Sequence, residues 1–138
     1  FQLEEFLVRE AEAGHIATPI ATRHATVHLH GHCHQKSFGT MGAVGKALGL
    51  VDGLEVRPIE SSCCGMAGSF GYQRETYKAS LAMAELSLLP AVRSAGPNDI
   101  VAADGFSCRH QIEHGTGRTP QHVARILRDA MVAEVAHR

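Results

Sequence analysis

The chain has 138 residues, a formal net charge of −1 with its ten histidines neutral, 44% hydrophobic residues and 20% charged ones. This balance is typical of one compact folded domain and excludes extended disorder. The near-neutral charge gives no basis for binding nucleic acid, and no apolar run approaches the roughly 20 residues of a membrane-spanning helix. We therefore expect a single domain over residues 1–138, without nucleic acid as a partner and without a membrane span.

The chain starts at Phe1, without an initiator methionine and without a secretory signal pattern. We interpret this start as that of a fragment of a larger protein located in the cytoplasm. Thiols stay reduced there, so the four cysteines favour a metal site over two disulfides. Buried small apolar side chains are the other interpretation of isolated cysteines.

The first half of the chain alternates helical and strand patterns. Apolar residues at helical spacing predict a helix over 3–11, and Gly14 follows it where a helix would stop. Val27 and Leu29 alternate with histidines and predict a strand over 25–30. Helical spacing returns at 41–48, and a second strand is expected over 54–59.

The second half continues the alternation. A helical face over 77–88 is followed by Pro90, which we expect to open a short turn. A short buried strand is predicted over 100–103. Thr119-Pro120 is a favourable start for a last helix with an apolar stripe up to Met131. Strands separated by helices predict an α/β fold, a small open and mostly parallel sheet flanked by helices.

Every cysteine follows a predicted strand. Cys33 comes after the first strand, Cys63 and Cys64 after the second, and Cys108 after the third. Because parallel strands end at one edge of a sheet, we expect the cysteine loops at the carboxyl edge and the four thiols in one place. Thiolate sulfur is the ligand of iron–sulfur clusters and of structural zinc. Three glycines in the loop over 63–71 would let the backbone approach a bulky inorganic group.

Four histidines, His28, His30, His32 and His34, alternate through the end of the first strand and into the first cysteine loop. In an extended chain they would share one face and could bind zinc together with Cys33. We favour another interpretation, because the thiols already supply four ligands. In it, the first two are strand residues, and the last two orient the loop or donate hydrogen bonds to sulfur.

Three segments together resemble the CCG cysteine-rich domain, most specifically in the double-cysteine glycine loop. They are His32-Cys33-His34-Gln35-Lys36, Cys63-Cys64-Gly65-Met66-Ala67-Gly68 and Gly105-Phe106-Ser107-Cys108-Arg109. The family includes a cysteine-rich subunit of heterodisulfide reductase and the iron–sulfur subunits of glycolate oxidase and anaerobic glycerol-3-phosphate dehydrogenase. The sequence of the loops is most similar to FAD-linked oxidases fused to an iron–sulfur region, which oxidise D-lactate or D-2-hydroxyglutarate.

The resemblance implies a ligand set and its surroundings. It makes Cys33, Cys63, Cys64 and Cys108 the metal ligands. It also places Gly65, His32, His34 and Arg109 around the cofactor, where they would tune its potential. The fullest family pattern has a cysteine where Gly105 stands, so the resemblance implies a [4Fe–4S] cubane or a zinc ion rather than a non-cubane cluster.

The function implied by the resemblance is electron relay. FAD in another part of the parent chain would take hydride from the hydroxy acid, and electrons would pass to a quinone or similar acceptor. The domain would not be catalytic alone, and it would lie in the cytoplasm or peripherally at the inner membrane. Two alternatives stay open: a structural or docking zinc domain without a redox role, and a thiol–disulfide reductase that uses the vicinal cysteines.

Overall fold

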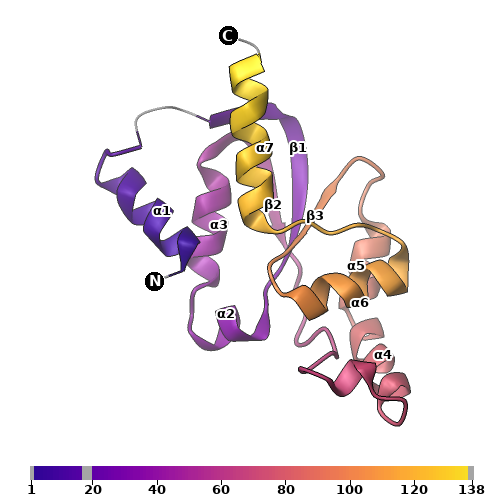
Figure 1. The fold of residues 1–138 in the computed structure, drawn as a ribbon. Helices are drawn as coiled ribbons and strands as arrows, with labels where there is room; N and C mark the ends of the chain where they lie inside the picture. The colour runs from indigo at the N-terminus through magenta and orange to yellow at the C-terminus, as the bar shows by residue number, and fades with distance from the viewer. Residues whose placement is uncertain (1, 17–19, 137–138) are drawn as a thin grey trace.

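The computed structural model describes residues 2–16 and 20–136. Its centre is a parallel sheet of three strands, β1 (Ile20–His30), β2 (Val51–Pro58) and β3 (Ile100–Ala103), in the order β2-β1-β3. A single parallel bridge from Ala102 to Gln121 continues the sheet beyond β3. The predicted α/β class with an open parallel sheet is therefore confirmed (Figure 1).

Helices lie on both sides of the sheet (Figure 1). On one side are α1 (Leu3–Glu12), α3 (Met41–Gly49) and α7 (Val123–Ala136), and on the other are α4 (Tyr77–Glu85), α5 (Leu88–Ser94) and α6 (Phe106–Thr116). The short α2 (Cys33–Ser37) follows β1, and a 3-10 turn, η1 (Phe70–Tyr72), precedes α4. None of the helices in the described ranges is long and apolar enough to cross a membrane.

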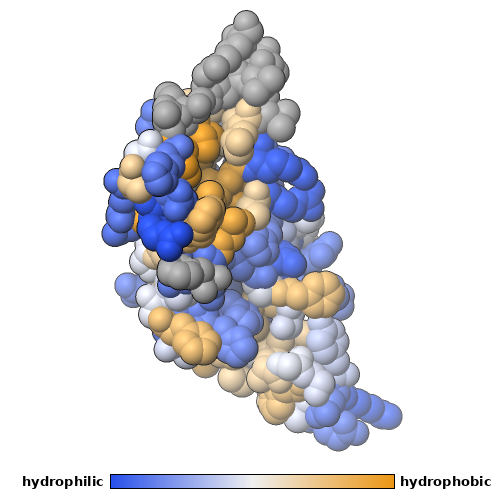
Figure 2. All heavy atoms as spheres, turned by 60° about the vertical axis from the view of Figure 1, so that its left-hand side comes forward, coloured by the Kyte–Doolittle hydropathy of each residue, from blue (hydrophilic) through white to orange (hydrophobic). Residues whose placement is uncertain are grey.

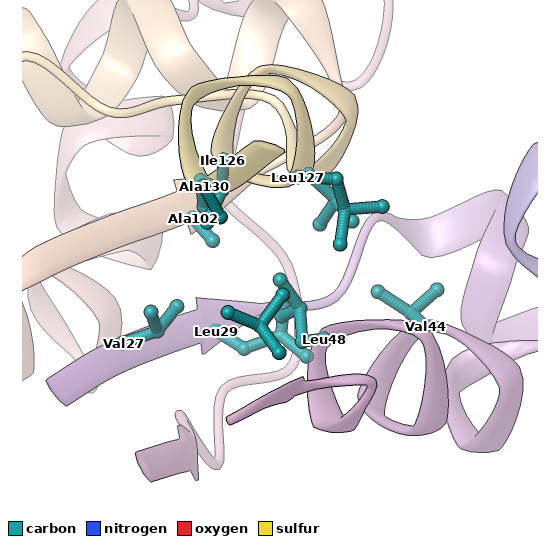
Figure 3. Close-up of a cluster of buried hydrophobic side chains, with 10 residues drawn as sticks. Val27, Leu29, Val44, Leu48, Ala102, Ile126, Leu127 and Ala130 are labelled. Carbon is teal, nitrogen blue, oxygen red and sulfur yellow. The ribbon is translucent and has the colours of Figure 1, made fainter. Parts of the chain in front are cut away.

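The face of the sheet toward α3 and α7 carries the larger core. Val27 and Leu29 of β1 pack with Val44 and Leu48 of α3 and with residues of α7 (Figure 3). Figure 2 shows the side of the molecule that carries α1, with hydrophobic side chains gathered in its upper part and hydrophilic ones around them. Alternation at the end of β1 thus places Val27 and Leu29 in this core, as the sequence predicted.

The opposite face of the sheet carries a second core. Val101 and Ala103 of β3 pack with Leu88 and Val92 of α5 and with Ile112 of α6. The strand register pairs His28 with Val101 and His30 with Ala103, so both histidines belong to this second face. The second core also contains Cys64 and Cys108. β1 therefore places apolar side chains on one face of the sheet and histidines on the other, which is the face of the second core with its two cysteines.

The predicted helix over 77–88 is wrong in its continuity. Helix α4 ends at Glu85 and α5 begins at Leu88, so Pro90 lies in the first turn of α5 rather than in a turn of its own. In one continuous helix the proline ring would clash with the carbonyl of Leu86. In a first turn the missing N–H of proline leaves no hydrogen bond unmade.

The last helix starts later than predicted, at Val123 rather than at Thr119-Pro120. Gln121 is held as an extended residue because its N–H donates to Val101 and its carbonyl accepts from Ala103. The carboxylate of Asp104 then accepts from the Val123 amide at 2.9 Å and caps the new helix. Helix α6 was missed altogether, since its apolar positions are few and it begins inside the third cysteine segment.

Candidate metal centre

The four cysteines lie at the carboxyl edge of the sheet. Cys33 is the first residue of α2, directly after β1, and Cys108 is in the first turn of α6, directly after β3. Cys63 and Cys64 stand in the loop that follows β2. The topology therefore brings three distant segments to one edge.

The sulfurs form two close pairs. Cys33 Sγ lies 3.7 Å from Cys63 Sγ, and Cys108 Sγ lies 3.4 Å from Cys64 Sγ. The outer pair includes the exposed Cys33, whereas Cys64 and Cys108 are buried, with exposed fractions of 4% and 1%. All four thiols are free, and none is in a disulfide. The site thus has a solvent side and a buried side.

The hydrogen bond within the buried pair shifts the pKa values of its two thiols in opposite directions. The hydrogen bond from Cys108 lowers the pKa of Cys64 below its ordinary value despite burial, and His30 acts in the same direction. The same hydrogen bond, together with burial, raises the pKa of Cys108. Burial and the nearby Cys63 raise the pKa of Cys33. Within the buried pair, Cys64 is therefore the thiol that loses its proton more readily.

His30 is one of the four histidines that could bind zinc with Cys33, although the sequence analysis favoured a strand role for it. Its side chain is almost fully buried, and its Nδ1 lies 2.8 Å from Ser61 Oγ. Its Nε2 is the one buried side-chain nitrogen or oxygen without a hydrogen-bond partner in the part of the chain that the structure describes. One ring nitrogen of His30 and the sulfurs of Cys64 and Cys108 lie within 4.8 Å of one another. The alternation of histidines along β1 could have indicated that His30 faces the cysteines. It does not, however, show how β1 is aligned with β3.

The double-cysteine loop depends on Gly65. This residue has φ +86°, a region that favours glycine, and its amide donates to Cys63 Sγ at 3.3 Å. A Cβ here would come within 2.1 Å of the carbonyl oxygen of Ser80 in α4. Gly65 was predicted next to the cofactor on the basis of the family resemblance. The structure shows its backbone hydrogen-bonded to a thiol and packed against a helix.

Gln111 of α6 holds the double-cysteine loop in place through its side-chain amide. Its buried side-chain amide lies 3.0 Å from the carbonyl oxygen of Cys64, and 3.2 Å and 3.1 Å from the carbonyl and hydroxyl oxygens of Ser80. A single residue thereby connects α6, the cysteine loop and α4. No sequence motif indicated this role, because a glutamine within a helix is common.

Replacing Gln111 by Leu should lower the free energy of unfolding by about 1–3 kcal/mol, since buried carbonyls lose their donor. Chemical denaturation of the metal-free protein measures this loss. Replacing the exposed Glu113 on the same helix by Leu is the matched control and should change stability by less than about 0.5 kcal/mol. Equal effects of the two substitutions would show that the loop is not held by Gln111.

The three polar residues predicted around the cofactor differ in their burial and in their hydrogen-bond partners. His32 is half-buried and caps α2, accepting from the His34 amide at 3.4 Å, and burial lowers the pKa of His32. His34 is exposed and meets His32 edge to face. Arg109 donates to the carbonyls of Ala103 and Asp104, at 3.0 Å and 2.6 Å. The guanidinium is therefore engaged at the end of β3.

Lys36 is a second residue that the sequence analysis missed. Its ammonium donates to the carbonyl of Ser61 and, at 3.0 Å, to that of Ser62. Both carbonyls directly precede the cysteine pair, so α2 holds the second cysteine loop against the first. The positive charge of Lys36 also lowers the pKa of Cys33 and partly offsets the effect of burial.

Comparison with known proteins finds relatives that include two dehydrogenases. The chain is 31% identical over 102 residues to a subunit of the anaerobic glycerol-3-phosphate dehydrogenase of Escherichia coli, an alignment that covers 74% of this chain and 25% of the relative. It is 32% identical over 75 residues to D-2-hydroxyglutarate dehydrogenase of Escherichia coli, covering 54% and 7%. Lactate utilization protein A of Exiguobacterium is 26% identical over 141 residues, covering 95% and 54%.

These relatives define what the chain is similar to. It spans about a quarter of the length of the glycerol-3-phosphate dehydrogenase subunit that it matches. No family model and no solved structure matches the chain. The similarity is consistent with a CCG-type domain, and the chain is related to parts of dehydrogenases. Its cysteine and histidine side chains form a group that could bind a metal.

Proposed function

We propose that this domain holds a [4Fe–4S] cluster through Cys33, Cys63, Cys64 and Cys108 and relays electrons within a larger dehydrogenase. The observation that carries the proposal is the meeting of two thiol pairs at one sheet edge, next to a buried histidine nitrogen that has no hydrogen-bond partner among the described residues. Such a nitrogen is rare in a folded protein, and it fits a site that is completed by a bound group.

The residues present fit a metal group with sulfur ligands. Four cysteines are the usual complement of a [4Fe–4S] cluster and also of tetrahedral zinc. Space around Gly105 argues against a fifth cysteine ligand, because a Cβ there would lie 2.8 Å from Cys108 Sγ and 2.3 Å from His32 Cδ2. The position at which this chain departs from the fullest family pattern is therefore already filled by His32.

An iron–sulfur group in this site would accept and release single electrons. The surrounding residues would set how readily it does so. The Gly65 amide donates to the sulfur of Cys63, and the buried ring of His30 lies beside the sulfurs of Cys64 and Cys108. Both groups would therefore stabilise added negative charge on the cluster. Burial of Cys64 and Cys108 excludes water from one side, while the exposed Cys33 leaves the other side open to an electron-transfer partner.

The names of the relatives suggest the parent reaction. We propose that the domain is part of a dehydrogenase that acts on D-2-hydroxy acids or glycerol 3-phosphate, with FAD bound outside residues 1–138. Electrons would pass from the flavin through this domain to a quinone or similar acceptor. The alignment with two dehydrogenases named for these substrate types supports the choice of substrate.

A redox titration tests the proposal. Protein reconstituted with iron and sulfide without oxygen should show broad visible absorbance that is bleached by dithionite and restored by an oxidant. The reduced form should give an electron paramagnetic resonance signal of about one spin per chain, as expected for a one-electron [4Fe–4S] couple. Absorbance that does not respond to reductant would contradict the relay role.

Structural zinc is the second candidate, and one feature favours it. His30, Cys64 and Cys108 offer a nitrogen and two sulfurs within 4.8 Å of one another, as in a mixed cysteine–histidine zinc site. In that case Ser61 would orient the histidine ring through Nδ1. The two candidates differ in redox response, because zinc neither accepts nor releases electrons.

A further inference from the structure

An open hollow of about 560 Å³ lies beside the cysteine site. Its wall includes Glu4 of α1, His32, His122, and the segment that leaves β3 at Asp104 and Gly105. Gly105 also packs against Cys108 Sγ, so the hollow adjoins the thiols without containing them. None of the roles proposed above for the cysteine centre uses the acidic side of this hollow.

Three potential metal ligands meet in this hollow. Glu4, Asp104 and His122 each offer one ligand atom, and these atoms lie within 4.8 Å of one another. They come from the first turn of α1, the end of β3 and the residue before α7. Segments far apart in the sequence thus supply two carboxylates and an imidazole at one point.

Glu4 is the observation that points to a ligand. The residue is 4% exposed, although it is acidic and lies on a surface helix. Among the described residues, the Glu4 carboxylate accepts a hydrogen bond only from the amide of Glu4 itself. Burial raises the pKa of Glu4 and the nearby charge of Asp104 adds to this effect, while the backbone hydrogen bond and His122 act in the opposite direction. A carboxylate that is buried with a single backbone donor is costly, so a cation beside Glu4, Asp104 and His122 would stabilise it.

The other two side chains are held in place by neighbours. Asp104 accepts from the Gln35 side chain at 2.6 Å and from the Val123 amide at 2.9 Å. His122 Nδ1 lies 3.1 Å from the Ala124 amide and 3.4 Å from Asp104 Oδ1. Metal ligands are usually oriented by such surrounding hydrogen bonds. Hydrogen bonds from neighbouring groups therefore hold Asp104 and His122 in place. Glu4 is the ligand with spare carboxylate lone pairs.

We propose that Glu4, Asp104 and His122 bind a divalent first-row transition-metal ion, separate from the cysteine centre. Carboxylate and imidazole ligands suit ions such as Mn²⁺, Fe²⁺ and Zn²⁺. Three protein ligands leave further coordination positions, and these face a hollow that is open to solvent. Water or a small oxygen-bearing ligand would complete the coordination.

Binding of Mn²⁺ to the full chain under reducing conditions tests this site, because Mn²⁺ prefers oxygen and nitrogen to thiolate. Electron paramagnetic resonance counts the free ion directly. We expect one site with a dissociation constant below about 1 mM in the wild type, and binding weakened by about tenfold or more in Glu4→Gln. Glu12→Gln, an identical change at an exposed position of the same helix, should bind as the wild type does.

Two further variants keep the test decisive. His122→Asn preserves an acceptor for the Ala124 amide and should also lose about tenfold or more, so it decides the matter if Glu4→Gln does not fold. Cys64→Ser should bind Mn²⁺ as the wild type does, which separates this site from the cysteine centre. Wild-type binding weaker than about 1 mM, or equal binding by wild type, Glu4→Gln and His122→Asn, would overturn the proposal.

Discussion

Gly65→Ala is expected to destabilise the metal-free domain by about 3 kcal/mol or more. A side chain at φ +86° costs about 1–2 kcal/mol by itself. The added Cβ would also meet the Ser80 carbonyl oxygen at 2.1 Å, and this atom belongs to the backbone of α4. Backbone cannot rotate away as a flexible side chain would, so the loop or the helix must shift. Chemical denaturation, with the unfolding midpoint followed by circular dichroism, measures the loss.

Gly68→Ala is the matched control in the same loop. Gly68 also has a positive φ, +67°, but a Cβ there meets no atom within 4 Å. This variant should lose only the conformational part, about 1 kcal/mol. The difference between the two variants therefore isolates the close contact between the cysteine loop and α4. Equal losses would mean that Gly65 is not packed against Ser80 as described.

Cys64→Ser should abolish stable metal binding while the α/β core remains folded. Cys64 is the thiol of the buried pair that loses its proton more readily, and removing a ligand should cost more than the roughly 10–100-fold typical of neighbouring residues. The core between β1, α3 and α7 does not involve the cysteines. We therefore expect the free energy of unfolding of the metal-free protein to fall by less than about 2 kcal/mol.

Zinc affinity by competition with a chelator, measured beside thermal unfolding, checks both parts of this expectation. Ser69→Ala, an exposed change in the same loop, should alter neither quantity. A cooperative unfolding transition that disappears in metal-free Cys64→Ser would contradict the independence of the core. The domain would then resemble zinc fingers, which fold only with their metal.

The sequence predicted the fold well where a hydrophobic pattern results only from burial of one face of a strand or helix. Alternation along β1 and helical spacing in α3 both follow from burial on one face, and the structure places both in the larger core. Boundaries were less predictable because they depend on contacts made elsewhere. The delayed start of α7 results from the pairing of Gln121 with β3, which no local pattern encodes.

The candidate site shows the same division. Strand order was enough to place the four cysteines at one edge, since parallel strands share a direction. The partners of the loops were not predictable, because Gln111 and Lys36 act through backbone carbonyls of segments far away in sequence. His30 required the register between β1 and β3, and the register becomes visible only once the strands are paired.

Iron, zinc and acid-labile sulfide content of protein purified without oxygen tests the central claim most directly. The account predicts about four iron and about four sulfide per chain, as a [4Fe–4S] cluster requires, and their loss in Cys64→Ser but not in Ser69→Ala. Purification in air should lower iron and sulfide, because the exposed Cys33 leaves one side of the centre open to oxygen. About one zinc per chain, with no iron assignable to these cysteines in the protein prepared without oxygen, would contradict the electron-transfer role and establish the structural one.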